Sequence, residues 1–272
     1  MDDKPAVSPE QLERLLAEFD RLRARHGPAA LDRVEEALFG EPPEPVGDGS
    51  ERPTFRVPGL TARPWHDPAR FPACHALEAG AEAIRGELLD TLGRREGFQA
   101  YRQDCDFFVP KDHWKTMYFL VGGNRVEENR RLCPRTAAIL DAIDETFGMV
   151  MFSALLPGGH IAPHRGPSNC RITIHLGLVV PPDCGLRVGE ETRGWEAGRC
   201  LAFDDTFEHE AYNRSGEARF VLFADVWHPE LSEAEIAALT AMQRLFAQGS
   251  NPQSLGRVLA DREAERGHAW WA

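Results

Sequence analysis

Two histidines, far apart in the chain, each follow an apolar segment with the composition of a β-strand. His164 lies in Pro-His-Arg-Gly, shortly after the apolar residues 149–156 have ended in Pro-Gly-Gly. His209 follows the apolar residues within 199–204 and a short polar stretch. Neutral imidazole is a ligand for iron, zinc and copper, and the mouth of a β-barrel can bring two distant strand ends to one metal ion. The pair therefore predicts a transition-metal site whose geometry is set by the fold.

Between these histidines, residues 171–175 read Arg-Ile-Thr-Ile-His. Successive side chains of a strand point to opposite faces, so Arg171, Thr173 and His175 share one face and the two isoleucines share the other. Because a β-branched face is typical of a core, we expect the Arg-Thr-His face to line a polar cavity. On these residues alone, a merely solvated face is an equally good interpretation.

A second strand-like run, 217–227, places Arg219 in line with Val221, Phe223 and Asp225. Burying an arginine beneath an apolar row costs on the order of several kcal/mol unless an anion meets it. A carboxylate can do so through two parallel hydrogen bonds to the guanidinium group. The row therefore indicates an anion-binding arginine, and the alternative is a structural ion pair with a neighbouring strand.

Three separated segments carry a family resemblance. PHRGPSNCRITIHLGLVVP (163–181), FDDTFEHEAYN (203–213) and RFVLFADVWHPELS (219–232) resemble, in this order, the aspartyl/asparaginyl β-hydroxylase family. That family consists of iron(II)- and 2-oxoglutarate-dependent oxygenases built on a double-stranded β-helix. The resemblance covers roughly 59–246 and is strongest over 157–231.

The resemblance implies roles for individual residues. His164 and His209 match the two iron ligands of the family. Ser153 and Arg219 match the residues that hold the far carboxylate of 2-oxoglutarate, and His175 matches a histidine near its metal-chelating end. The implied cofactors are Fe(II), 2-oxoglutarate as co-substrate and O2.

The position of the usual third metal ligand is not acidic here, and a carboxylate near the two histidines has another expected role. Most 2-oxoglutarate oxygenases carry a third, acidic ligand two residues after the first histidine, and here that position is Gly166. The family is unusual in having glycine there, so Gly166 agrees with the resemblance. Asp205 is expected to orient His209 from outside the ligand set, and a role in the turn at the strand end is about as plausible.

The substrate-binding residues depart from the family pattern. Familiar members have an arginine at the place of Thr173, which together with the equivalent of Arg171 grips the side-chain carboxylate of the substrate. Thr173 cannot form that ion pair, so specificity for acidic residues is an open question. Compensating cations could come from Arg125, Arg130 or Lys111.

The expected activity is therefore that of a dioxygenase that hydroxylates an unactivated carbon. The first hypothesis is hydroxylation at the β-carbon of an Asp or Asn residue in a peptide or peptide-like substrate. The alternative substrate is a free amino acid, a natural-product intermediate or a lipid. An alternative of another class is a non-catalytic jelly-roll module for binding or sensing, and the presence of both histidines and Arg219 argues against it.

The elements that must position these residues predict an α+β fold. Short apolar runs separated by Gly, Pro, Asn and Asp suggest a β-sandwich or barrel; they are 149–156, 170–180, 185–188, 200–204 and 217–227. Helical spacing predicts helices over 76–92 and 134–147 and a capped helix from Ser232 to about Ala247. We expect a double-stranded β-helix, or cupin-like jelly roll, flanked by helices.

Four regions are expected along the chain. Residues 1–40 form an N-terminal helical hairpin, which begins with Ser8 as N-cap. Residues 41–58 are rich in Pro, Gly and acidic residues and are expected to be a linker. The oxygenase-like domain spans 59–250, and 251–272 form a C-terminal tail.

Composition limits the range of partners. The chain of 272 residues has a formal net charge of −12, which argues against non-specific binding to nucleic acid. No apolar run is long enough for a membrane helix, and the N-terminus lacks the pattern of a secretory signal. The six cysteines show no C-x-x-C spacing and are expected to be reduced thiols. We expect a cytoplasmic protein with a peptide or small-molecule substrate; the sequence does not indicate an oligomeric state.

Overall fold

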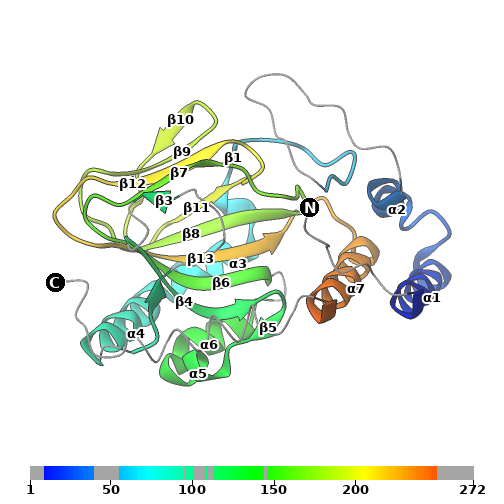
Figure 1. Ribbon diagram of the computed structural model, residues 1–272, viewed down its shortest axis with the longest axis horizontal. Helices are drawn as coiled ribbons and strands as arrows, with labels where there is room; N and C mark the ends of the chain where they lie inside the picture. The colour runs from blue at the N-terminus through cyan, green and yellow to red at the C-terminus, as the bar shows by residue number, and fades with distance from the viewer. Residues whose placement is uncertain are drawn as a thin grey trace.

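Two antiparallel sheets face each other in the computed structural model (Figure 1). The structure describes residues 9–39, 55–94, 96–100, 108–109, 113–143 and 146–249. Within these residues the larger sheet follows the order β1 (Trp65–His66), β11 (Cys200–Phe203), β8 (Arg171–Val179), β13 (Arg219–Trp227), β6 (Thr146–Leu155), β4 (Trp114–Val121) and β2 (Gln99–Ala100), and β5 (Asn124–Arg125) pairs with β4. The smaller sheet follows the order β10 (Glu191–Arg193), β9 (Cys184–Val188), β12 (His209–Asn213), β7 (His160–His164) and β3 (Phe108–Val109).

The chain passes back and forth between the sheets from β6 to β13. Strands β6, β8, β11 and β13 belong to the larger sheet, and β7, β9, β10 and β12 belong to the smaller one. This alternation is the double-stranded β-helix, so the predicted α+β jelly-roll fold is confirmed. Side chains from both sheets form the inner core, which includes Leu155, Val188, Phe203 and Val221.

Helices cover the outer face of the larger sheet (Figure 1). They are α3 (Pro72–Ala79), α4 (Ala81–Arg94), α5 (Glu127–Leu132) and α6 (Pro134–Asp141), with the short 3-10 helix η1 (Pro68–Arg70) before them. Their apolar sides join the outward residues of β8, β13 and β6 in the largest core cluster. Because β8 and β13 are covered on both faces, nearly all of their residues are buried.

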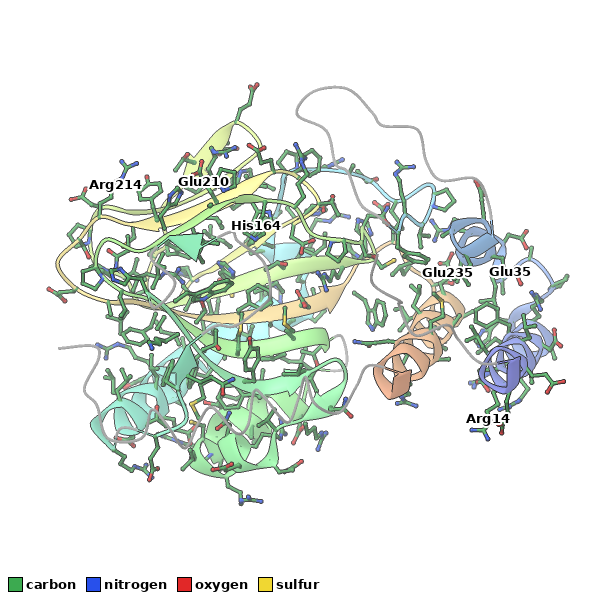
Figure 2. The ribbon with its side chains drawn as sticks, viewed as in Figure 1. Arg14, Glu35, His164, Glu210, Arg214 and Glu235 are labelled. Carbon is green, nitrogen blue, oxygen red and sulfur yellow. The ribbon has the colours of Figure 1, made fainter. Side chains whose placement is uncertain are left out.

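The N-terminal hairpin packs against the C-terminal helix. It consists of α1 (Pro9–His26) and α2 (Asp32–Phe39), and both contact α7 (Glu233–Gly249). Phe19, Leu31 and Val34 are fully buried there. Arg33 donates two hydrogen bonds to the carboxylate of Glu235, at 2.7 Å and 2.6 Å. Figure 2 shows Glu235 on α7 beside the hairpin that carries Glu35 and Arg14.

Two predicted helices are wrong in their bounds. The helix expected over 76–92 is two helices, α3 and α4, that meet at Gly80, where a Cβ would lie 2.5 Å from the side chain of Ile139 on α6. The helix expected over 134–147 ends at Asp141, and Thr146 already pairs with Val226 in the sheet. Long-range strand pairing therefore overrides the local helical pattern.

Other predictions fall partly on undescribed positions. Ser232 caps α7 as predicted, because its hydroxyl accepts a hydrogen bond from the backbone of Glu235 at 3.3 Å. Residues 41–54 of the predicted linker, and the predicted tail 251–272, lie outside the described residues. The five cysteines in the described part are free thiols. No helix in that part is both long and apolar enough to cross a bilayer.

Candidate functional site

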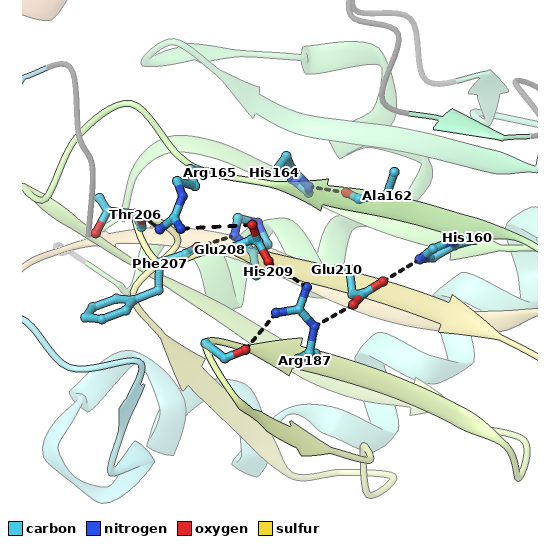
Figure 3. A network of polar contacts seen from close by, with 11 residues as sticks. His160, Ala162, His164, Arg165, Arg187, Thr206, Phe207, Glu208, His209 and Glu210 are labelled. Carbon is cyan, nitrogen blue, oxygen red and sulfur yellow. Dashed lines mark hydrogen bonds and ion pairs between the residues drawn. The ribbon is translucent and has the colours of Figure 1, made fainter. Parts of the chain in front are cut away.

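His164 and His209 lie opposite each other on adjacent strands of the smaller sheet. His164 ends β7, His209 begins β12, and the two residues are direct partners in the antiparallel register. Their ring centroids are 4.1 Å apart (Figure 3). The side chain of His209 is buried and that of His164 is half-buried. The sheet thus brings together the two residues that the sequence predicts as metal ligands.

Each imidazole is oriented by a backbone carbonyl two residues earlier in the chain. Nδ1 of His164 lies 2.8 Å from the carbonyl oxygen of Ala162, and Nδ1 of His209 lies 3.0 Å from that of Phe207. A carbonyl oxygen only accepts, so both Nδ1 atoms carry the proton and both Nε2 atoms keep a lone pair. This is the tautomer that a metal-binding histidine needs.

Electrostatics favour the neutral form of both rings. Burial lowers the pKa of His164, and burial together with the neighbouring His164 lowers the pKa of His209 to about 4. The carboxylate of Asp205 acts in the opposite direction on both. At neutral pH the pair therefore offers two uncharged nitrogen ligands. Within the described ranges no third Cys, His, Asp or Glu completes a metal-binding cluster with them.

Asp205 occupies the space beside Gly166. A Cβ atom at Gly166 would lie 2.1 Å from the carboxylate carbon of Asp205, and the backbone N–H of Gly166 donates to the carbonyl oxygen of Asp205 at 2.6 Å. The carboxylate also accepts a hydrogen bond from Arg171 at 3.1 Å. The turn itself is held by Asp204, which accepts from the backbone and hydroxyl of Thr206. Glycine at 166 is thus a packing requirement of Asp205.

A buried arginine lies on the inner face of the jelly roll. Arg219 is 1% exposed, and among the described residues its Nε and Nη1 atoms have no hydrogen-bond partner. Its guanidinium carbon lies 4.6 Å from the ring centre of Trp195, and burial lowers the pKa of Arg219 to about 10. A buried guanidinium with free donors fits a planar anion such as a carboxylate.

Ser153 lies on the strand next to Arg219. It pairs with Val221 in the β6–β13 register, so its side chain is on the same inner face as that of Arg219. Its hydroxyl accepts a hydrogen bond from the indole N–H of Trp114 at 2.9 Å. The hydroxyl proton is therefore available to a second acceptor in the cavity.

His175 lies on the same inner face, on β8. It is buried among aromatic rings, with the ring centres of Phe203 and Phe223 at 5.1 Å and 5.3 Å. Its Nδ1 accepts a hydrogen bond from the indole N–H of Trp195 at 3.3 Å. Burial, and to a lesser extent the charge of Arg219, keep the pKa of His175 well below its usual value.

The two predicted substrate-binding residues face a buried carboxylate. Arg171 lies 3.1 Å from Asp205 and 3.6 Å from Asp225, which is completely buried. Thr173 is the direct strand partner of Asp225, and its hydroxyl lies 3.4 Å from the carboxylate. Arg171 is therefore already flanked by two acidic groups of the protein.

The cations proposed to compensate for Thr173 do not reach this cavity. Arg125 and Arg130 both pair with Asp141 at the end of α6, at 2.8 Å and 2.6 Å, on the helix-covered side of the sheet. For these two arginines the expectation is wrong, because β5 and α5, which carry them, place both side chains against Asp141 of α6. Lys111 lies outside the described residues.

A charged network braces the strands that carry the histidines (Figure 3). Arg187 on β9 pairs with Glu210 at 2.5 Å and with Glu208 at 3.0 Å. The other oxygen of Glu210 lies 2.7 Å from Nε2 of His160 on β7. The network links β9, β12 and β7 and engages His160 away from the His164–His209 pair.

Sequence reasoning missed Trp195, Trp114 and Asp225 as neighbours of the site. Trp195 lies in the loop between β10 and β11, where no periodicity marks it. Asp225 lies in line with Arg219 in the run 217–227, so the alternation of that run was the available signal for it. Trp114 begins β4, which the sequence alone did not connect to the site.

The jelly roll places two adjacent neutral imidazoles and a buried arginine on its inner side. Comparison with known proteins identifies the family. The family described as aspartyl/asparaginyl beta-hydroxylase matches residues 78–229, which is more than half of the chain. The chain belongs to this family.

Several curated relatives support this assignment. The aspartyl/asparaginyl beta-hydroxylase of Mus musculus is 34% identical over 200 residues, which cover 71% of this chain and 27% of the relative. The ornithine lipid ester-linked acyl 2-hydroxylase of Rhizobium tropici is 37% identical over 177 residues, or 63% of each chain. The chain thus spans only about a quarter of the mouse protein.

Among solved structures, a prolyl-4-hydroxylase of Pseudomonas putida is similar over 54% of this chain and 87% of its own, with 13% identity and a TM-score of 0.36. The strand order described above defines the double-stranded β-helix.

Proposed function

We propose that this chain is an iron(II)- and 2-oxoglutarate-dependent dioxygenase that hydroxylates an unactivated carbon. The observation that carries the proposal is Arg219, a buried cation on the inner face of the jelly roll with two donors that no described residue engages. Burying such a charge is unfavourable unless an anion meets it, and the far carboxylate of 2-oxoglutarate has the matching charge and shape.

The described residues divide into two groups. His164 and His209 would hold the metal through Nε2, because their Nδ1 atoms are engaged by backbone carbonyls. Arg219 and Ser153 would bind the far carboxylate of 2-oxoglutarate, and His175 would meet its metal-chelating end. When bound, iron(II) and 2-oxoglutarate supply oxidative chemistry in which O2 and 2-oxoglutarate yield succinate, CO2 and one oxygen atom for a C–H bond.

Asp205 lies outside this ligand set in the proposal. Its carboxylate is held by Arg171 and lies next to Gly166, close enough to oppose the lowered pKa of both histidines. It would orient the groups around the metal rather than bind it directly.

The first substrate hypothesis follows the family: the β-carbon of an Asp or Asn residue in a peptide. One observation favours a second hypothesis, an uncharged group on an amino acid, a natural-product intermediate or a lipid. Arg171 is already flanked by Asp205 and Asp225, and Thr173 supplies a hydroxyl in place of a second cation. The relative from Rhizobium tropici is named for hydroxylation of a lipid acyl chain.

The activity is tested by succinate formation from 2-oxoglutarate in air with iron(II). We expect His164→Ala to abolish it, because one of two protein ligands is removed. His160→Ala is the matched control, since His160 lies on the same strand and pairs with Glu210 instead. Equal succinate formation by wild type and His164→Ala would contradict the proposal, and no turnover with any substrate class would favour a binding module.

A further inference from the structure

The indole of Trp195 contacts two of the proposed co-substrate residues at once. Its N–H donates to Nδ1 of His175 at 3.3 Å, and the guanidinium carbon of Arg219 lies 4.6 Å from the ring centre. The planes of the indole and the imidazole are inclined by only 26°, with centroids 6.0 Å apart, as expected for an edge-to-edge hydrogen bond. Trp195 itself is 7% exposed.

The loop that carries Trp195 is seated directly on β8. Gly177, two residues beyond His175, donates its backbone N–H to the carbonyl oxygen of Arg199 at 3.0 Å. A Cβ atom at Gly177 would lie 2.4 Å from the carbonyl oxygen of Glu196. Glycine at 177 therefore lets the loop approach the strand closely enough for the indole to reach His175.

The hydrogen bond determines where His175 carries its proton. An indole nitrogen can only donate, so Nδ1 of His175 must be the acceptor and cannot itself be protonated. The proton of the neutral ring is then on Nε2. This tautomer gives the cavity a donor, which is what a carboxylate at the metal-chelating end of a 2-oxo acid needs.

The contact with Arg219 has a separate effect. Stacking a guanidinium on an indole face stabilises the cation and restricts its plane while leaving the N–H groups free. In Arg219 two of these donor atoms are indeed without a partner among the residues that the structure describes. Trp195 thus orients hydrogen-bond donors at both ends of the proposed ligand: Nε2–H of His175 at one end and the N–H groups of Arg219 at the other.

We propose that Trp195 is a positioning residue for 2-oxoglutarate, which fixes His175 as an Nε2–H donor and holds the guanidinium of Arg219 in place for the far carboxylate. The inference rests on the proposed function, because it requires that 2-oxoglutarate is the ligand of this cavity.

Trp65 provides an internal comparison. It also stacks with an arginine, since the guanidinium carbon of Arg193 lies 4.4 Å from its ring centre, and it packs against the same inner core. Its indole nitrogen, however, has no hydrogen-bond partner in the part of the chain that the structure describes. Trp65→Phe therefore makes the same chemical change as Trp195→Phe without touching His175.

The test compares wild type, Trp195→Phe and Trp65→Phe as metal-free proteins. Calorimetry measures the Kd of 2-oxoglutarate, and nitrogen NMR of 15N-histidine-labelled protein reports the tautomer of His175, whose signals are assigned with His175→Ala. We expect Trp195→Phe to bind 2-oxoglutarate about tenfold more weakly, because one buried hydrogen bond is lost. The same variant should show both tautomers of His175. Trp65→Phe should bind within about twofold of wild type and keep the Nε2–H tautomer.

The possible outcomes distinguish a failure of the proposed role of Trp195 from a failure of the proposed function. Thermal unfolding of each variant first establishes that it is folded. If folded Trp195→Phe binds 2-oxoglutarate as well as wild type and keeps a single Nε2–H tautomer, the role of Trp195 is wrong while the proposed function stands. If wild type shows no binding of 2-oxoglutarate, with or without a divalent metal, the proposed function itself fails and this inference fails with it.

Discussion

A single buried guanidinium limits what the cavity of this protein can bind. Arg219 is 1% exposed, and no carboxylate of the described residues is recorded as its partner. Burying an unpaired guanidinium destabilises the empty protein, and the binding of an anion offsets this cost. The neighbouring hydroxyl of Ser153 is oriented by Trp114 and adds a neutral donor. The inner face is thus suited to an anionic ligand rather than to a cation.

Replacing this arginine should therefore weaken the co-substrate specifically. We expect Arg219→Gln to raise the Kd of 2-oxoglutarate at least about 100-fold, because a buried charged pair is lost. Arg214→Gln is the control, since Arg214 is exposed just after β12, in the connection that leads to β13 (Figure 2). Calorimetry of both variants checks this, and an unchanged Kd in Arg219→Gln would remove Arg219 from the site.

The close contact between Gly166 and Asp205 predicts an effect on stability rather than on binding. A Cβ at this position collides with the carboxylate of Asp205, so Gly166→Ala should destabilise the protein by about 1–3 kcal/mol. The double variant Gly166→Ala/Asp205→Ala should recover part of that loss, because the second change removes the colliding atoms. Urea unfolding of the two single variants and the double variant measures the coupling, and strictly additive losses would contradict the account.

At the scale of elements, the hairpin α1–α2 is fixed to α7 by one bidentate ion pair over an apolar contact. The Glu235 carboxylate that binds Arg33 also accepts from the backbone N–H of Ser232 at 2.8 Å, so it caps α7 as well. The pair therefore links the position of the hairpin to the start of the last helix.

We expect Arg33→Ala to lower the free energy of unfolding by about 1–3 kcal/mol, because it leaves the nearly buried carboxylate of Glu235 without its cation. Arg25→Ala, which changes an exposed arginine of α1, should stay within about 0.5 kcal/mol of wild type. Urea unfolding followed by circular dichroism compares them. Equal effects of the two substitutions would mean that the Arg33 contact contributes no more than an ordinary surface charge.

The sequence was most informative where strand alternation is strict. The runs 170–180 and 217–227 became β8 and β13, and Arg171, His175 and Arg219 lie on their inner faces, as the alternation predicts. Arg171 pairs with Trp227 and therefore lies at the opposite end of the strand pair from Arg219. The alternation is visible because each of these strands separates a core face from a cavity face. The roles of these residues remain predictions, as do the boundaries of the predicted domains.

Elements that depend on distant partners could not be predicted. The strand β12, which begins at His209, is only five residues long and gains its stability from pairing with β7 and β9. The break at Gly80 depends on the approach of Ile139 from another helix. Trp195 reaches His175 through a loop whose path is set by Gly177. In each case the deciding contact joins segments that are far apart in the chain.

For the whole molecule, buried neutral histidines predict sensitivity to acid. Burial lowers the pKa of His66 to about 4, and that of His209 also to about 4, and it lowers the pKa of His228. In the unfolded chain these groups titrate near 6.5, so the folded state binds fewer protons between pH 6.5 and pH 4. Stability is therefore full above pH 6.5 and falls as the pH is lowered towards 4.

His66 lies away from the candidate metal site and isolates this effect. We expect the stability lost by metal-free wild type between pH 7 and pH 4.5 to shrink by about 2–3 kcal/mol in His66→Phe. His26→Phe, at an exposed position of α1, should leave the loss unchanged. Urea unfolding at the two pH values measures it, and an identical loss in wild type and His66→Phe would contradict the assignment.

The most direct test of the central claim is an anaerobic titration of the metal-free protein with iron(II) and 2-oxoglutarate, followed by the visible absorption band of iron(II) chelated by a 2-oxo acid. We predict that the band forms in wild type and in His160→Ala, is absent in His209→Ala, and requires about 100-fold more 2-oxoglutarate in Arg219→Gln. A folded wild-type protein that shows no band at saturating iron(II) and 2-oxoglutarate would contradict the proposal that this jelly roll is a 2-oxoglutarate-dependent oxygenase.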